Sequence, residues 1–485
     1  MHGARCWDPL AGRRGDETVV RCPDGPGDLR PADVDRFEAV FDVSTSASDR
    51  KLLVLVVVDL TPTTMAAYLH CMRAGHAVIL LDARFGDAHI ARVLDEFRPD
   101  TVVCGSAHAK ALHDAPAYEL RAAFEDTALL RRRRPQPGLT HPLLAVLLAT
   151  SGSLGPFRFA CLTYSGLEHN ARAIATALGL GSDDTGALYL SMGYSYGLSV
   201  LNSHLAAGGD LTVVRRPPTS VDHWKVFDEG GCTTFAAVPE TYRLLAASRH
   251  DLTAHPALRL AAQAGGRLAE DLVRQYAGAL LDSGREFAVM YGQTEATARI
   301  ACHKGADVLR HPRSVGGPIP GVTLRIDDGS GRAVPEGQEG QIMVSGPGTM
   351  LGYARCREDL GALPGCPIAS LPTGDLGRLS VGRLYVTGRM ARIAKVHGVR
   401  VSLDEMEQFF TAVGPAAVVS DDDERVLVYV EGPVAKYRAA RREALTLYGL
   451  PPATVRVLQI PAIPRTVSGK VAYGRLPDSR GHSEG

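Results

Sequence analysis

An apolar run in the sequence ends in residues that suit the chemistry of a polyphosphate. Residues 143–149 are uncharged and apolar, and hydroxyl-bearing residues, glycines and one cation follow directly. Backbone N–H groups of such a loop can approach a polyphosphate closely, while the cation offsets its charge. The loop residues that we single out are Thr150, Ser151, Gly152, Ser153, Gly155 and Arg158. Taken alone, the segment is interpreted equally well as a surface turn, and it is not a P-loop because no Gly-Lys-Ser/Thr closes it.

A second apolar run, residues 287–290, leads into polar groups that can hold a metal ion. The residues that follow it are Tyr291, Gly292, Gln293, Thr294 and Glu295. Carboxylates are ligands that Mg²⁺ accepts in proteins, and loops at the carboxyl ends of strands bind phosphates. We therefore expect the Thr294 hydroxyl to contact a phosphate and the Glu295 carboxylate to bind Mg²⁺.

Three shorter segments in the second half of the chain carry further charged groups. Asp375 closes a Pro-Thr-Gly-Asp turn, and its carboxylate can accept hydrogen bonds from two ribose hydroxyls. Arg389 follows a glycine, and Lys395 and Gly398 come soon after it. Lys470 closes a Ser-Gly-Lys turn. Each segment alone is more typical of a structural loop, so it is their order and spacing along the chain that indicate a site.

Alternating strands and helices must position these loops. Residues 52–58 are a β-branched apolar run, and apolar residues at helical spacing follow up to Gly75. Residues 77–81 and 101–104 predict two more strands, separated by a helix that begins at Asp87. Strands that are apolar throughout are typical of a parallel sheet covered by helices.

The later part of the chain predicts a change of architecture. A Ser-x-x-Glu capping box predicts a helix start at Ser165, and a second one predicts a start at Ser402. Between them lies the Gly- and Pro-rich stretch 311–340, followed by short apolar segments at 341–345 and 383–387. This pattern predicts an antiparallel β portion.

The composition is that of a folded protein without net charge. The chain has 485 residues, of which 45% are hydrophobic and 22% charged, and its 53 Lys and Arg balance 53 Asp and Glu. Nucleic acid is therefore not an expected partner.

The apolar runs fall far short of the ~20 residues of a membrane span, and charges near the N-terminus argue against export. The nine cysteines form no Cys-x-x-Cys pair, so we expect buried thiols in a reducing cytoplasm.

Together, these segments resemble the adenylate-forming superfamily of acyl-CoA synthetases, aryl-CoA ligases, firefly-luciferase-like enzymes and stand-alone adenylation domains. The resemblance covers roughly residues 50–476. It implies an α/β fold with a large N-terminal domain, residues 1–388, of parallel α/β sheets plus a small β-barrel-like portion. A small mobile α+β domain, residues 389–485, would carry Lys470.

The resemblance also implies a role for each residue type. Thr294 would contact the α-phosphate of ATP, Glu295 would bind Mg²⁺, and Asp375 would bind the ribose with help from Arg389. Lys470 would be the catalytic lysine. The remaining implied site residues are Gly265 and Gly266 beside the adenine and acyl group, Tyr194 as the gate of the acyl channel with Tyr196 in the same motif, and Lys395 and Gly398 along the path of the thiol.

The implied reaction couples a small carboxylic acid to ATP as an acyl-adenylate and then transfers the acyl group to a thiol. The thiol would belong to CoA or to the phosphopantetheine of a discrete acyl carrier protein. Family members that activate α-amino acids hold the ammonium with an Asp, and our alignment places Gly197 there. We therefore expect an aliphatic, hydroxy or aryl acid. Because the sequence ends at Gly485, soon after Lys470, we expect the acceptor to come from outside.

Four positions depart from the family pattern and keep two alternatives open. Leu154, Phe157 and Arg158 stand where Thr or Ser, Pro, and Lys are usual, so we expect a raised KM for ATP. Ala391 replaces an Asp or Lys at the hinge predicted near residues 388–391, which puts efficient thioester formation in question. One alternative is an amide synthetase that passes the acyl group to a free amine. The other is a degenerate member retained as a binding or scaffold subunit.

Overall fold

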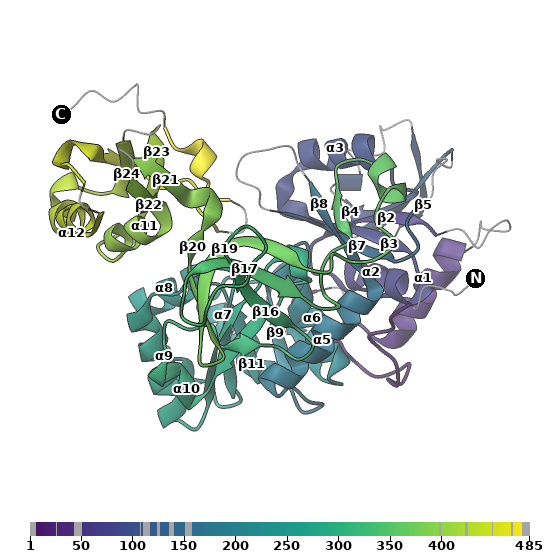
Figure 1. The fold of residues 1–485 in the computed structure, drawn as a ribbon. Helices are drawn as coiled ribbons and strands as arrows, with labels where there is room; N and C mark the ends of the chain where they lie inside the picture. The colour runs from purple at the N-terminus through teal and green to yellow at the C-terminus, as the bar shows by residue number, and fades with distance from the viewer. Residues whose placement is uncertain are drawn as a thin grey trace.

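The structure is a computed structural model, and it describes most of the chain. The described residues are 6–25, 27–42, 51–106, 108–109, 117–123, 127–134, 140–150, 158–396, 399–421, 425–448, 450–466 and 469–477. Figure 1 shows two large sheets with helices on their faces and, set apart from them, a smaller group of C-terminal strands and helices.

The first large sheet, counted over the described residues, has eight strands. Its first six strands in spatial order run parallel, and the last two are antiparallel. In spatial order they are β1 (Val20–Arg21), β10 (Asp210–Val213), β9 (Thr185–Leu188), β11 (Thr234–Ala237), β12 (Leu260–Gln263), β13 (Glu286–Tyr291), β14 (Ala301–Lys304) and β15 (Gly317–Pro318).

The second large sheet has a parallel centre with antiparallel edges. The parallel strands are β7, β3, β2 and β4, and the other described strands pair antiparallel. In spatial order the strands are β18 (Gly352–Ala354), β8 (Phe159–Thr163), β7 (Leu144–Ala149), β3 (Ala77–Asp82), β2 (Leu53–Val58), β4 (Thr101–Gly105), β6 (Thr127–Arg132) and β5 (Tyr118–Ala123).

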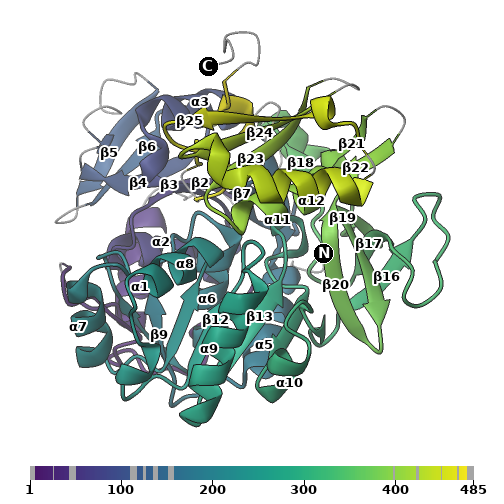
Figure 2. The ribbon, with the colours of Figure 1, turned by 90° about the vertical axis from the view of Figure 1, so that its left-hand side faces the viewer.

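Smaller sheets follow in the second half of the chain. An open antiparallel sheet beside the two large ones takes the place of the predicted barrel-like portion (Figure 2). Its strands are β16 (Thr323–Asp327), β17 (Gly340–Ser345), β19 (Leu371–Ser380) and β20 (Arg383–Arg389). The C-terminal strands are β21 (Ile393–Val396), β22 (Val399–Ser402), β23 (Ala416–Asp421), β24 (Arg425–Glu431) and β25 (Val455–Ile460). They have their own hydrophobic cluster, while the boundary predicted at 388/389 stays a prediction.

Helices cover the faces of these sheets. Those of the large sheets are α1 (Pro31–Asp42), α2 (Pro62–Ala74), α3 (Asp87–Phe97), α5 (Tyr164–Leu178), α6 (Ser195–Ala206), α7 (Val221–Glu229), α8 (Pro239–Ala247), α9 (Glu270–Asp282) and α10 (Ala306–Arg310). The C-terminal helices are α11 (Leu403–Thr411) and α12 (Arg438–Tyr448). One continuous hydrophobic cluster includes α2, α5, α6 and strands from both large sheets, so the sheets share a core.

Most predicted elements are confirmed, and two details differ. The apolar run 52–58 contains the fully buried strand β2, and α2 ends at Ala74 with Gly75 as its C-cap, whose φ of 75° is left-handed. Ser402 caps α11 by accepting a hydrogen bond of 3.2 Å from the N–H of Glu405. The helix predicted to start at Ser165 instead begins at Tyr164, because Thr163 at the end of β8 supplies the capping oxygen. The first sheet ends in antiparallel strands at its β15 edge, and the second sheet is antiparallel at both edges, where β7 and β8 form a hairpin and β6 pairs with β4.

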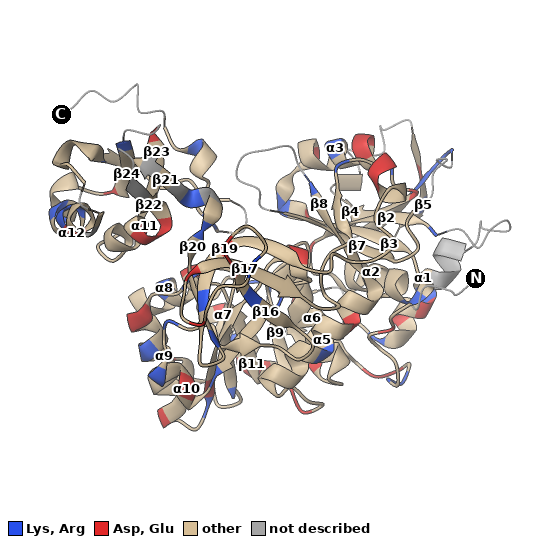
Figure 3. Ribbon diagram, viewed as in Figure 1, with Lys and Arg blue, Asp and Glu red and all other residues tan. Residues whose placement is uncertain are grey.

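The surface agrees with the balanced composition. Figure 3 shows Lys and Arg interspersed with Asp and Glu over the described parts of the chain. None of the described helices has the length and apolar character needed to cross a membrane. Cys71, Cys104, Cys161 and Cys232 are buried as predicted, whereas Cys366 is exposed.

Candidate active site

Strand ends from different sheets meet in one region. β12 and β13 are parallel neighbours, so the loops that follow them leave the same edge of the first sheet. The antiparallel sheet reaches this edge, because Tyr291 at the end of β13 contacts Asp375 in β19. We call this region the strand-end site and define it by Thr294, Glu295, Asp375, Arg389 and Lys470.

The Asp375 carboxylate has two partners in the strand-end site. Arg389 lies opposite Asp375 in the β19–β20 pair, with its Nε 3.2 Å from Oδ1. The Tyr291 hydroxyl donates a hydrogen bond of 2.6 Å to Oδ2. Burial raises the pKa of Asp375 above its ordinary value, although Arg389 and Tyr291 act in the opposite direction. The carboxylate is oriented by these contacts, and its further lone pairs can accept ligand hydroxyls.

The Glu295 carboxylate is oriented by Tyr353. The Tyr353 hydroxyl donates a hydrogen bond of 2.7 Å to Oε1 of Glu295. Burial and the Glu295 charge raise the pKa of Tyr353, so its hydroxyl keeps the proton that it donates. The guanidinium carbon of Arg158 lies 3.9 Å from the centre of the Tyr353 ring, a cation–π geometry. The cation of the predicted phosphate loop therefore lies close to the predicted metal ligand.

A close backbone crossing positions Thr294. At Gly292, a Cβ would lie only 1.6 Å from the carbonyl oxygen of Ala298. Ala298 itself has a φ of 110°, which is costly for a residue with a side chain. The Thr294 hydroxyl hydrogen-bonds the Ser195 hydroxyl at 3.2 Å, and Ser195 is the first residue of α6. The turn after β13 is thus attached to the N-terminus of that helix.

Lys470 lies within electrostatic range of the two site carboxylates. Its turn is closed by the Thr466 N–H, which donates to the Lys470 carbonyl at 2.7 Å. Burial by surrounding protein atoms lowers the pKa of Lys470, as does Arg389, while Asp375 and Glu295 raise it. Lys470 is nevertheless exposed to solvent, so the surrounding protein atoms do not enclose it.

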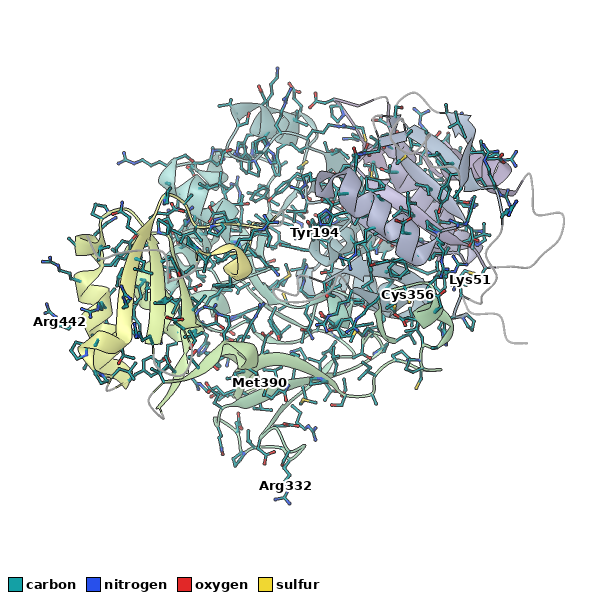
Figure 4. The ribbon with its side chains drawn as sticks, turned by 90° about the horizontal axis from the view of Figure 1, so that it is seen from above. Lys51, Tyr194, Arg332, Cys356, Met390 and Arg442 are labelled. Carbon is teal, nitrogen blue, oxygen red and sulfur yellow. The ribbon has the colours of Figure 1, made fainter. Side chains whose placement is uncertain are left out.

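The predicted acyl-channel tyrosines have different surroundings. Tyr194 is partly buried and lies near the middle of the view in Figure 4; its ring centre is 6.2 Å from that of Phe85, and burial raises its pKa to about 12. The Tyr196 hydroxyl donates a hydrogen bond of 3.1 Å to the Ala262 carbonyl. Gly265 follows β12 with a φ of 86°, and a Cβ there would lie 3.9 Å from the Tyr196 ring. Tyr196, rather than Tyr194, therefore adjoins the predicted glycine loop.

Several predicted residues lie outside the described part of the chain. They are Ser151, Gly152, Ser153 and Gly155, together with Leu154, Phe157 and Gly398. The two ends of the phosphate loop are described, and the Thr150 N–H donates to the Arg158 carbonyl at 3.2 Å. Of Lys395, the backbone in β21 is described. Gly266 is placed beside Gln263, whose side-chain amide donates to its carbonyl at 2.7 Å.

The structure leaves no room for a side chain at Gly197, the position where an ammonium-binding Asp was considered. A Cβ at Gly197 would lie 2.2 Å from the carbonyl oxygen of Ser191, so no side chain fits there. An Asp at this helix position would face backbone rather than substrate. The expectation of an acid without an α-amine therefore loses this basis and stays a prediction.

Sequence analysis missed Ser195, Tyr353 and Arg299. Arg299 is only 4% exposed, and its guanidinium carbon lies 4.6 Å from the centre of the Tyr196 ring. Its Nη2 donates a hydrogen bond of 3.1 Å to the Ser199 hydroxyl. A signal for Arg299 was present, because it is the one charged residue of the segment 296–303 and charged residues are seldom buried without a partner.

A family model described as AMP-binding enzyme matches residues 44–354 of the chain. The chain belongs to the AMP-binding enzyme family. The fold and the clustering of the predicted residues at the strand-end site agree with this membership. This membership agrees with the resemblance to the adenylate-forming superfamily.

Curated relatives match most of the chain at moderate identity. A salicylyl-CoA synthase / salicylate adenylyltransferase from Streptomyces sp is 29% identical over 75% of this chain and 68% of its own length. An L-proline–[L-prolyl-carrier protein] ligase from Streptomyces coelicolor is 29% identical over 91% of this chain and 90% of its own. The chain spans only 10% of a hybrid PKS-NRPS synthetase from Penicillium oxalicum and 6% of a malpinin synthetase from Mortierella alpina.

Solved structures share the fold at lower identity. ATP-bound MatB from Rhodopseudomonas palustris superposes with a TM-score of 0.77 at 22% identity, covering 97% of this chain and 98% of that one. An o-succinylbenzoate CoA synthetase from Bacillus subtilis, in complex with ATP and magnesium, gives a TM-score of 0.76 at 19% identity over 97% and 99% of the two chains.

The strand-end site fits ATP and Mg²⁺, the predicted cofactors. No group of three or more His, Cys, Asp or Glu side chains that could hold a metal occurs among the described residues. Mg²⁺ does not need such a group, since it commonly binds one or two carboxylates together with water and substrate phosphates. Glu295 would be the residue to hold the metal, and Arg158, Arg389 and Lys470 would be the cations to face a polyphosphate.

Proposed function

We propose that the chain converts a carboxylic acid without an α-amine to an acyl-adenylate and transfers the acyl group to a thiol, in the cytoplasm. The observation that carries this proposal is the convergence of Lys470 with Glu295 and Asp375, from three distant parts of the sequence. A cation, a metal ligand and a ribose acceptor are the groups that an attack on the α-phosphorus of ATP requires.

The residues divide the first half-reaction between them. Asp375 accepts the ribose hydroxyls, and Tyr291 and Arg389 hold it in orientation. A carboxylate oxygen of the acid attacks the α-phosphorus, and the bond to the β-phosphate oxygen breaks, so pyrophosphate leaves. Lys470 lies between the two anions and offsets their charge. Mg²⁺ bound to Glu295 would supply further positive charge on the phosphates.

In the second half-reaction a thiol attacks the acyl carbon, and AMP leaves. CoA or a carrier-protein phosphopantetheine would be the acceptor, and the salicylyl-CoA synthase among the relatives supports a thiol. The amine of Lys470 must then withdraw for the thiol to enter. We propose that residues 389–485 rotate about residues 388–391 to achieve this.

The cavities beside the strand-end site favour an acid without an ammonium group. Two cavities border α6, and none of their described lining residues is Asp or Glu. Arg299 lines the second cavity, and its charge would repel an ammonium. The positive charge of Arg299 therefore supports a substrate without an α-amine, whereas the geometry at Gly197 gives no such support.

Acid-dependent exchange of pyrophosphate into ATP tests the first half-reaction. A panel of aliphatic, hydroxy, aryl and α-amino acids is supplied with ATP and Mg²⁺, and at least one acid without an α-amine should support exchange. The Asp375→Ala variant serves as the control. Absence of exchange with every acid would instead support the degenerate binding subunit.

The acceptor is tested in a second experiment with the best acid. CoA, a phosphopantetheinylated carrier protein and simple amines are added in turn, and the acyl product is measured by mass spectrometry. Acyl thioester is the expected product. Amide formation without thioester would favour the amide synthetase, the alternative that Ala391 keeps open.

A further inference from the structure

A buried cation lines the second cavity beside α6. This cavity, which we call the α6 cavity, has a volume of about 20 Å³ and is bordered by residues of α5, α6, β11, β12 and β13. Arg299 contributes the guanidinium, although it is 4% exposed. Burying a charge without a counter-charge costs free energy, so a position of this kind needs a physical reason.

The protein itself leaves Arg299 incompletely paired. Within the described part of the chain, Nη2 donates to Ser199 and Nε has no hydrogen-bond partner. No described carboxylate pairs with the guanidinium. The backbone of Arg299 is fixed by Asn170, whose side-chain amide donates to the Arg299 carbonyl at 2.9 Å. The guanidinium is therefore held in place while its Nε–H has no hydrogen-bond acceptor.

The other polar groups of the α6 cavity are satisfied by the protein. Ser199 donates to the Tyr196 carbonyl at 2.7 Å, and Tyr196 donates to Ala262. The two ring nitrogens of His204 contact the Val200 carbonyl and the Thr234 hydroxyl, both at 2.8 Å. Burial lowers the pKa of His204, so this side chain is neutral. Arg299 alone among the described lining residues therefore gives the cavity its charge.

The α6 cavity is connected to the strand-end site through one helix. Ser195 contacts Thr294, whereas Ser199 contacts Arg299. Residues four apart on an α-helix are displaced by about 6 Å along its axis. Both serines line the first cavity, and Ser199 also lines the α6 cavity. A short substrate activated near Thr294 can therefore place its far end near Arg299.

We infer that the acid activated by this enzyme carries a second carboxylate, which Arg299 binds in the α6 cavity. The inference rests on the proposed function and names its substrate class. A carboxylate supplies the counter-charge and accepts hydrogen bonds from the guanidinium N–H groups that the protein leaves without a partner. Arg299 is then a specificity-determining residue, and an analogue without the second carboxylate leaves a buried charge unpaired.

Matched acids and one pair of variants test this inference. Pyrophosphate exchange is measured with glutarate, pentanoate and monomethyl glutarate, and with isophthalate and benzoate, for the wild type, Arg299→Met and Arg299→Lys. In the wild type, kcat/KM for the diacid should exceed that for the matched monoacid by about 100-fold. Arg299→Met should remove this preference through the KM for the acid, leaving the KM for ATP within about threefold. Arg299→Lys should retain part of it.

Thermal unfolding separates recognition from a structural role. Without ligand, Arg299→Met should unfold at the same or a higher temperature, because an incompletely paired buried charge is removed. A large drop in unfolding temperature, or monoacids used as well as diacids by the wild type, would overturn the inference while leaving the proposed function intact. Absence of exchange with every acid would overturn both.

Discussion

At the scale of single residues, the environment of each charge decides its chemistry. Lys470 lies near two carboxylates, and its flexible stem can bridge the oxygens of an acid and a phosphate. Asp375 is buried, yet it is held by a tyrosine and an arginine. Glu295 is oriented by Tyr353, whose ring also contacts the guanidinium of Arg158. Each of these contacts can be removed separately.

Removal of the Lys470 amine should affect one half-reaction. Lys470→Ala should lower the rate of acyl-adenylate formation by about 10²- to 10³-fold, because a positioned cation is lost. Thiolysis of a supplied acyl-adenylate should stay within about threefold. Single-turnover assays of each step measure both rates, and Lys436→Ala, an exposed lysine near α12, is the control. Equal losses in both steps would contradict the assignment.

The raised pKa of Asp375 predicts a pH dependence of ATP binding. The protonated carboxyl binds ribose hydroxyls and Arg389 less well, so the KM for ATP should rise as pH falls through this raised pKa. In Asp375→Asn the KM should be about 10- to 100-fold higher and flat over the same pH range. ATP titrations between pH 4.5 and roughly pH 8 measure both profiles.

The same shift has a consequence for stability. Because folding raises the pKa of Asp375, its favourable contribution is fully present below the unfolded pKa and is lost as pH rises through the folded value. At pH 7 the ionised group therefore costs stability. Asp375→Asn should accordingly unfold at an equal or higher temperature at pH 7, and a clear decrease would show that the Arg389 contact outweighs burial.

Loss of one hydroxyl should weaken metal use. In Tyr353→Phe the ring and its Arg158 contact remain, but Glu295 loses its 2.7 Å hydrogen bond. The Mg²⁺ concentration for half-maximal exchange should rise about 10- to 100-fold. Tyr385→Phe is the matched control, since the Tyr385 hydroxyl contacts His311 outside the site. An unchanged Mg²⁺ requirement would show that Glu295 does not bind the metal.

At the scale of elements, the turn after β13 depends on a backbone position that only glycine can occupy. Gly292→Ala would bring a methyl group into the Ala298 carbonyl, so we expect destabilisation by about 1–3 kcal/mol and loss of exchange activity. Gly278→Ala is the control within α9, where nothing lies within 4 Å. It should raise stability by about 0.5–1 kcal/mol. Denaturant unfolding measures both variants.

The elements that sequence predicts well are those with local signals. The apolar run that forms β2 and the capping serine of α11 are read from adjacent residues. The antiparallel pairing of β8 with β7, its neighbour along the chain, was not predicted, because both strands are apolar throughout and so match the pattern of parallel strands. Arg299 was missed although it is the one charged residue of the segment 296–303, because its burial depends on α5 and α6, which lie far from it in the sequence. The lack of space for a side chain at Gly197 could not be predicted either, because it depends on the backbone of residues 190–191, which packs against this position.

At the scale of the whole molecule, an ion pair joins the C-terminal strands and helices to α8 beside the first sheet. Figure 4 shows Met390 where β20 leads into this group. Arg465 lies 3.8 Å from Glu240 in α8, and both side chains are partly exposed. Such a pair contributes about 0–1 kcal/mol, which does not lock the two parts together.

The weak Glu240 contact predicts a small effect of its removal. Glu240→Gln should change the rate of pyrophosphate exchange by less than about fivefold, because the pair contributes so little. Exchange assays at low and high salt measure this, and the Lys470→Ala variant provides the contrasting large loss. A loss comparable to that of Lys470→Ala would show that Arg465 and Glu240 fix the lysine in place.

The hydrogen bond from Tyr291 to Asp375 joins residues 84 positions apart and two different sheets. No contiguous stretch of the chain can therefore build the nucleotide-binding groups by itself. During refolding, helical signal should return before catalysis does, because the separate sheets must first dock. Nucleotide added during this step favours the docked form, so the substrate itself can assist the final stage of maturation.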